Sequence, residues 1–202
     1  MPLITTRANI VYGSGFGKSA AAIDTGAMFE IGMVQVGSAG ASSITFSSIP
    51  STYKHLQIRG LMRAFGSVSG LNILKYRYNS DSGSNYTGHT LYGTGSSALA
   101  TSATSQTYGW FSRTSSPTSA SLANTFGAFV IDIFDYTSTS KNKTSRAISG
   151  VDRNGSGAVE LTSSVWLNSA NAINRIDLYD ESSDNFMQYS TFALYGIKGE
   201  VA

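Results

Sequence analysis

The residues of this chain that could carry chemistry are few and dispersed. There are two histidines, His55 and His89, twelve Asp and Glu residues, and no cysteine. The lack of cysteine excludes thiolate metal sites and a cysteine nucleophile. A catalytic zinc site needs further ligands near a histidine, and a serine triad needs a histidine beside a buried carboxylate; the spacing supports neither. We therefore predict no catalytic residue, no metal site, no cofactor and no enzymatic activity.

Residues 12–19, Tyr-Gly-Ser-Gly-Phe-Gly-Lys-Ser, differ by one residue from a phosphate-binding loop. Residues 129–132, Phe-Val-Ile-Asp, also resemble the apolar run and aspartate that would hold magnesium. However, such a loop needs glycine where Tyr12 stands, and it must join a buried parallel strand to a helix. The remaining sequence shows no helical crossovers. We interpret residues 12–19 as part of a flexible, glycine-rich arm.

A second tempting pattern places oxygen-bearing side chains at alternate positions, as in calcium loops: Asn79, Asp81 and Asn85, with Gly83 between them. The run contains a single carboxylate and lacks the downstream glutamate that completes such loops. A solvated turn is the better interpretation.

Four carboxylates on predicted strands or their ends could form a glycosidase pair if two of them faced each other. They are Asp132, Asp135, Glu160 and Asp177. Sequence alone does not give their separation. An ion pair with arginine, or a bond to a loop, is the commoner role of an aspartate on a strand.

Four aromatic residues lie in or near predicted loops rich in Ser, Asn and Gly: Tyr86, Tyr92, Trp110 and Phe111. If exposed, they would form a surface for a sugar or a protein partner. The alternative, that they are aromatic plugs at the ends of a sandwich core, remains open.

The composition favours strands over helices. Of the 202 residues only 13% are charged while 21 are glycine, and the net charge is +2. Because the basic residues are dispersed, there is no stripe for a phosphate backbone, and we expect no nucleic-acid partner. No apolar stretch is long enough to span a bilayer, so we expect no membrane association, and the first residues lack the order of a secretion signal, so we expect synthesis in a cytoplasm.

The most apolar run, residues 126–136, predicts a strand in the middle of a sheet. Phe129, Ile131 and Ile133 fall on one face at the two-residue period. Turn residues at 137–142 followed by a second extended run at 143–151 predict an antiparallel hairpin.

Further short strands are predicted along the chain, at 28–36, 43–47, 54–63, 71–78, 86–92, 158–161, 164–167, 173–179 and 189–197. For the low-complexity stretch 93–124 we predict a hairpin around Trp110 and otherwise loop. Together these elements predict an all-β fold, an antiparallel jelly-roll-like β-sandwich over residues 37–202.

Along the predicted strand 71–78, the apolar residues change from odd-numbered to even-numbered positions between Ile73 and Leu74. This indicates either a bulge or a strand with one face against a neighbouring subunit. On the second alternative we predict a homo-oligomer, specifically a homotrimer.

Residues 1–36 are predicted to be an N-terminal arm, because they are glycine-rich and have too few periodic apolar positions to bury themselves. The arm carries short apolar pieces that suit burial in another chain. The candidate attachment residues are Leu3, Ile4, Ile10, Val11, Tyr12 and Phe16.

Four segments resemble a domain common in structural proteins of tailed bacteriophages: residues 42–60, 84–93, 126–136 and 189–199. The similarity covers most of residues 42–199. The resemblance implies a component of the virion, and it carries over no catalytic residue.

The resemblance does not separate head from tail, but a short arm in front of the domain favours the head. A capsid decoration, or cement, protein would bind the major capsid protein in many copies, commonly as trimers, with its arm laid over the shell. The alternative is a short tail fibre or adhesin that contacts tail proteins and binds a host surface glycan at the aromatic loops. A polysaccharide-cleaving enzyme on the tail would need a carboxylate pair.

Overall fold

The computed structural model describes residues 27–66, 71–117 and 122–199, and within them the chain forms twelve β-strands and no helix. The all-β prediction is confirmed. The strands are β1 (Met28–Gln35), β2 (Ile44–Phe46), β3 (His55–Met62), β4 (Leu71–Tyr78), β5 (Tyr86–Gly93), β6 (Ala98–Gln106), β7 (Gly109–Pro117), β8 (Gly127–Ile133), β9 (Lys143–Asp152), β10 (Gly157–Trp166), β11 (Ile176–Asp180) and β12 (Thr191–Ile197).

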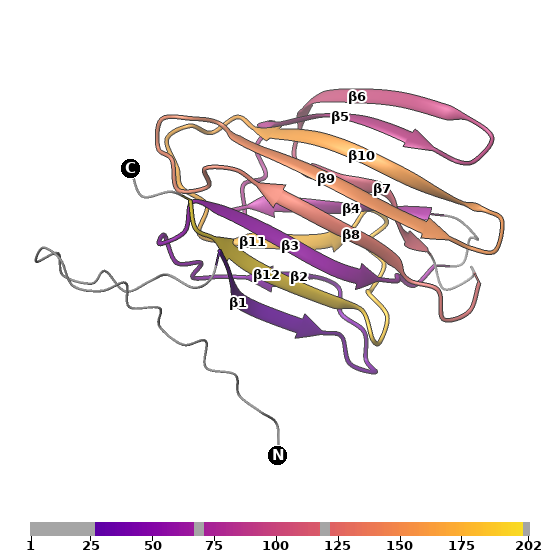
Figure 1. Cartoon of the computed structure of the whole chain (residues 1–202). Coiled ribbons are helices and arrows are strands. Elements are labelled where there is room, and N and C mark those ends of the chain that lie inside the picture. Colours follow the sequence, from indigo (N-terminus) through magenta and orange to yellow (C-terminus); the bar gives the residue numbers. More distant parts are fainter. Residues whose placement is uncertain (1–26, 67–70, 118–121, 200–202) are drawn as a thin grey trace, which may run out of the picture.

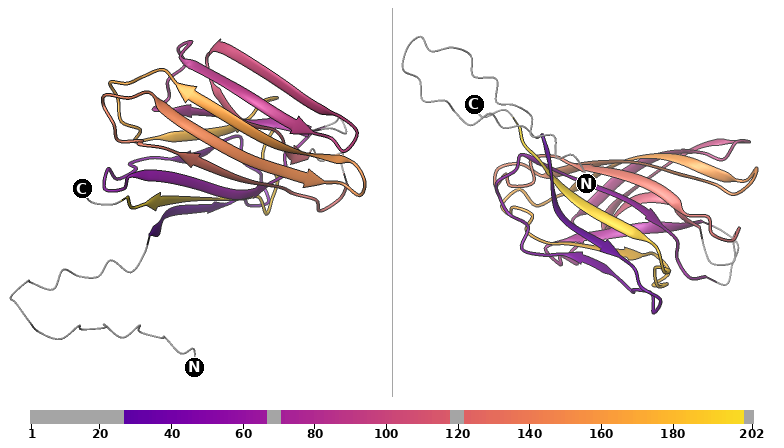
Figure 2. Two further views of the ribbon diagram at one scale, coloured as in Figure 1. Left: turned by 45° about the horizontal axis from the view of Figure 1, so that its top comes forward. Right: turned by 60° about the horizontal axis from the view of Figure 1, so that its bottom comes forward.

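The strands form two antiparallel sheets that pack as a sandwich (Figure 1). The larger sheet has eight strands in the order β1-β12-β3-β8-β9-β10-β5-β6, and the smaller has four in the order β2-β11-β4-β7. Figure 2 shows the same arrangement from two further sides, with β1 at one end of the larger sheet and the β5–β6 hairpin at the other.

The strand pairs are nested along the chain. β1 pairs with β12, β2 with β11, β3 with β8, and β4 with β7. Two hairpins interrupt this order: β5–β6 lies between β4 and β7, and β9–β10 lies between β8 and β11. The two inserted hairpins pair with each other through β10 and β5 and extend the larger sheet beyond β8.

Strand β8 lies inside the larger sheet between β3 and β9, as its apolar sequence predicts. The side chains of Phe129, Ile131 and Ile133 are all buried between the sheets. Phe129 pairs with Gly60 of β3, and its ring lies where a Cβ at residue 60 would stand. Glycine is therefore required at position 60 because the aromatic ring crosses the backbone there.

Strand β4 is an interior strand of the smaller sheet, between β11 and β7. Its pairing with β7 shifts register between Asn72 and Leu74 and again between Leu74 and Lys75. The extra residues at both shifts lie in β7, so β4 itself alternates regularly and points Leu74, Tyr76 and Tyr78 into the core. Leu71 and Ile73, at the alternate positions, are only partly buried, and the predicted trimer stays a prediction.

The predicted boundary between arm and domain is wrong by one strand. Residues 28–35 form β1, which pairs with β12 along its length, and Val36 is buried. The apolar side chains of Ile31 and Val34 pack against the core. The sandwich therefore includes residues 28–36.

The stretch 93–124, predicted to be mostly loop, contains the two full strands β6 and β7. They are consecutive but lie in different sheets, so they do not form a hairpin around Trp110. The low-complexity sequence hides them because β6 is built of Ala, Ser and Thr, whose small side chains give no apolar periodicity.

Candidate functional site

The predicted aromatic surface is wrong for three of its four residues. Tyr86 is 0%, Phe111 1% and Trp110 6% exposed, so they belong to the core and cannot contact a ligand from solvent. Phe111 stacks on Tyr76 with ring centroids 3.8 Å apart. Only Tyr92 stays partly exposed. The alternative interpretation, aromatic residues filling a sandwich core, describes Tyr86, Trp110 and Phe111.

The candidate attachment residues Leu3, Ile4, Ile10, Val11, Tyr12 and Phe16 lie outside the described residues, as does the glycine-rich run 12–19. Their role in attachment stays a prediction. Asp132, the suggested partner of that run, binds Arg146 Nη2 at 2.9 Å and accepts a hydrogen bond from Gln57 Nε2 at 2.7 Å. Its carboxylate is thus engaged within the sheet.

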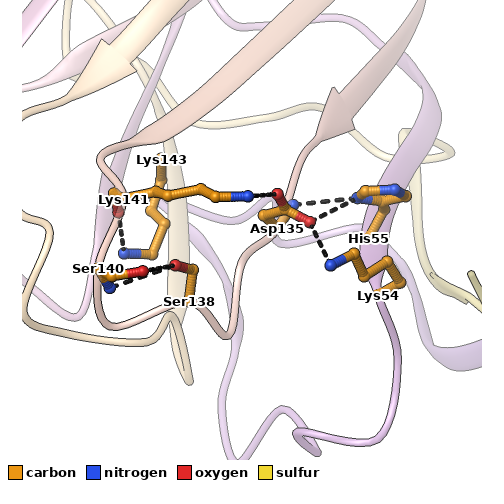
Figure 3. Close-up of polar contacts among 7 residues, drawn as sticks. All are labelled: Lys54, His55, Asp135, Ser138, Ser140, Lys141 and Lys143. Atoms are coloured by element: carbon orange, nitrogen blue, oxygen red, sulfur yellow. Dashed lines mark hydrogen bonds and ion pairs between the residues drawn. The ribbon is translucent and has the colours of Figure 1, made fainter. Parts of the chain in front are cut away.

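A polar cluster surrounds the predicted candidate Asp135 at the end of β8 (Figure 3). Asp135 forms ion pairs with Lys54 at 2.9 Å and with Lys141 at 2.8 Å. The hydrogen bonds from Lys141 and Lys54 lower the pKa of Asp135 to about 2. Lys143 is buried beside the same loop and donates from Nζ to the carbonyl oxygens of Lys141 at 2.9 Å and of Asn168 at 3.1 Å.

His55 lies next to Asp135, but in the wrong geometry for catalysis. Its Nδ1 accepts a hydrogen bond from the backbone N–H of Asp135 at 3.0 Å, and the Asp135 carboxylate is 3.9 Å from the same nitrogen. A catalytic His–Asp pair requires the opposite arrangement, with a proton on Nδ1 donated to the carboxylate. The contact therefore ties the start of β3 to the end of β8 and has a structural role.

The other predicted carboxylates do not converge either. Asp177 of β11 pairs with Arg175 at 2.6 Å, in the smaller sheet. Glu160 is buried on the inner side of β10, whereas Asp132 lies on the outer side of β8. Asp81 accepts hydrogen bonds from Gly83 N, Asn85 Nδ2 and Trp166 Nε1, so it closes a turn with internal donors. In the part of the chain that the structure describes, no group of three or more His, Asp or Glu side chains could hold a metal ion.

The structure reveals a surface that the sequence analysis missed, on the outer side of the inserted hairpins. We call it the outer apolar face and define it by six residues that share one side of the larger sheet: Leu91, Ala100, Val130, Ile148, Val159 and Leu161. Four of these side chains are between 48% and 62% exposed: Leu91, Ile148, Val159 and Leu161.

The outer apolar face is continuous because its residues are in register. Val130 pairs with Ile148, and Ile148 pairs with Leu161. Leu161 in turn pairs with Leu91, and Leu91 with Ala100. The result is one apolar row that crosses five neighbouring strands. A contiguous exposed apolar patch often marks a contact with another molecule.

The opposite side of the same strands is polar and covered. Trp110 Nε1 donates to Thr90 Oγ1 at 3.0 Å, and Thr90 Oγ1 is 3.2 Å from Thr162 Oγ1. Thr162 Oγ1 donates in turn to Glu160 at 3.1 Å. The inserted hairpins thus bury hydroxyl groups against β7 and turn apolar side chains outward, the reverse of the usual order.

Within the described ranges there is no helix that could cross a membrane. Comparison with known protein families, with curated proteins and with solved structures finds no match to this chain.

Proposed function

We propose that this protein is a structural component of a tailed-bacteriophage particle, and specifically a capsid decoration protein. In this proposal it binds the major capsid protein through the N-terminal residues 1–26 and displays the β-sandwich on the outside of the head. Its place is therefore the virion. The homotrimer predicted from the sequence stays a separate prediction, and the proposal does not depend on it.

The observation that carries the proposal is the nested strand pairing. With the two inserted hairpins set aside, the order is β1-β12-β3-β8 over β2-β11-β4-β7, eight strands in two sheets. We infer that this core is a jelly roll, an architecture used by viral capsid and lectin domains. The jelly roll supports the proposed function only by analogy with other proteins of this fold, because one fold can serve many functions. The four segments that resemble phage structural proteins contribute β2, β3, β5, β8 and β12 of this sandwich.

The alternative, a tail fibre or adhesin that binds a host glycan, relied on exposed aromatic residues. Tyr86, Trp110 and Phe111 are buried, so the surface on which that alternative depended is lost. Stacking on a sugar requires an accessible ring face. The decoration hypothesis does not need these residues.

Add-back to particles that lack the protein tests the proposal. Labelled full-length protein should appear at many positions over the shell, whereas a tail component would appear at one vertex or along the tail. A chain that begins at Ala27 keeps every described strand and should fail to bind, because it lacks the predicted attachment residues. Normal binding of the shortened chain would show that the sandwich itself makes the attachment, and the role of residues 1–26 would be wrong.

A further inference from the structure

We infer that the outer apolar face is a self-association surface, buried against the same face of a second copy of this chain. The inference goes beyond the proposed function, because it concerns a contact between copies in solution and requires no particle. It rests on the charge, shape and extent of the face.

The charge of the face favours a neutral partner. All six of its residues are uncharged, and the row that borders it on one side contains Asp132 and Arg146, which already satisfy each other at 2.9 Å. A nucleic acid or a strongly charged protein would find no complementary charge on the six residues. A second copy presents the same six uncharged residues, and the exposed Arg59, which continues the row beyond Val130 on β3, would lie at the rim of the contact.

The face carries both hollows and projecting side chains. Three shallow hollows of about 490, 330 and 370 Å³ adjoin one another, and Leu161 lines all of them. Leu161 and Val159 project beside these hollows with about half or more of their surface exposed. When two such faces meet about a two-fold axis, the projecting side chains of one copy can enter the hollows of the other, as inner faces interdigitate in a β-sandwich.

The neighbouring edge of the sheet does not oppose this contact. β6 ends the larger sheet and contains no charged residue over Ala98–Gln106. Free edge strands are usually protected by charged side chains or proline, and β6 has neither. An uncharged edge beside an apolar face is consistent with a region that another copy covers.

The area of the face limits how tightly two copies can bind each other. Six residue positions, with strands about 4.8 Å apart and rows about 7 Å apart, give an apolar area of roughly 200 Å². A standard interface buries about 800 Å² on each partner, so the polar side chains around the face must form the rim. We therefore expect a reversible dimer that forms at micromolar concentrations.

Sedimentation of the full-length chain tests the inference. Leu161→Arg places a charge at the centre of the face and should raise the dimer dissociation constant by about ten-fold or more. The matched control is Leu122→Arg, because Leu122 is 49% exposed against 48% for Leu161 but lies outside the face, between β7 and β8. The control should change the constant by less than about two-fold. Unchanged melting temperatures would show that both variants fold.

Cross-linking gives a second measurement that does not depend on weakening the contact. Because the chain has no cysteine, Leu161→Cys introduces a single thiol. Mild oxidation should join two copies through it, and Leu122→Cys should give far less covalent dimer. The inference is overturned if the wild-type chain is monomeric at about 100 µM, if Leu161→Arg associates like the wild type, or if the assembly is a trimer, which one two-fold face cannot close. These outcomes are read without particles, so they are independent of the add-back experiment.

Discussion

At the scale of single residues, Asp180 is a carboxyl group whose charge conflicts with its buried environment. It is buried at the end of β11, where its Oδ1 accepts hydrogen bonds from Ser182 N at 3.0 Å and Asn72 Nδ2 at 3.1 Å. Among the described residues, its Oδ2 has no hydrogen-bond partner. Burial, together with the nearby charge of Asp184, raises the pKa of Asp180 to about 6.

This raised pKa predicts a specific dependence of stability on pH. Between about pH 4 and pH 6 the folded chain retains a proton on Asp180 that the unfolded chain has lost, so the free energy of unfolding should fall as pH rises through this window. Asp180→Asn keeps the shape and removes the charge. The variant should be more stable than the wild type at pH 7 by up to about 3 kcal/mol, with a smaller slope between pH 4 and 6.

Urea unfolding at several pH values measures the effect. Asp184→Asn is the control, because it removes a neighbouring charge but leaves the Asp180 carboxyl in place, and it should retain most of the slope. Asp135 acts in a separate window: its pKa is lowered to about 2, so the stability it contributes is lost only as pH falls below about 4. If Asp180→Asn kept the wild-type slope of unfolding free energy between pH 4 and 6, Asp180 would not be the group that titrates in this window.

At the scale of elements, β8 carries the centre of the core. Ile131 is fully buried between the sheets, whereas Val130 on the other side of the same strand is only partly buried. Ile131→Ala should therefore reduce the free energy of unfolding by roughly 2–5 kcal/mol. Val130→Ala should cost clearly less, because its site is not enclosed.

Asp135 provides a second control for β8. It lies just past the strand with a φ of 47°, a conformation that asparagine tolerates. Asp135→Asn removes two ion pairs at the surface and should cost only about 1 kcal/mol at neutral pH. If denaturation midpoints showed that Asp135→Asn destabilises the chain more than Ile131→Ala, β8 would not be the central element.

At the scale of the whole molecule, the position of β1 decides where the domain begins. A chain that starts at Ala27 keeps β1 and should unfold at the same temperature as the full-length chain. A chain that starts at Gly37 lacks β1, loses buried Val36 and leaves β12 as an unpaired edge. The apolar contacts of Ile31, Val34 and Val36 lost with it should cost about 3 kcal/mol, or about 10 °C in melting temperature. Calorimetry of the three chains checks this order, and equal melting temperatures would show that β1 adds nothing to the sandwich.

Features that depend on local alternation can be predicted from the sequence alone. Phe129, Ile131 and Ile133 are apolar at every second position, and a strand places such residues on one side whatever its neighbours are. The same alternation places Leu74, Tyr76 and Tyr78 on one side of β4, and all three are buried. The two-sheet fold class follows from many such strands without helices.

Which side of each strand is covered cannot be predicted in this way, because it depends on how the two sheets pack. Alternation in β9 and β10 divides the side chains between two faces. It does not show which of the two faces packs on the other sheet. Here β7 covers the hydroxyl side, where Thr90, Thr162 and Trp110 bond to one another, so Ile148 and Leu161 are left outside. For the same reason Phe111 is buried although its surroundings are polar in sequence. Burial depends on residues distant in the chain, and their positions are fixed by the order of the strands in the two sheets.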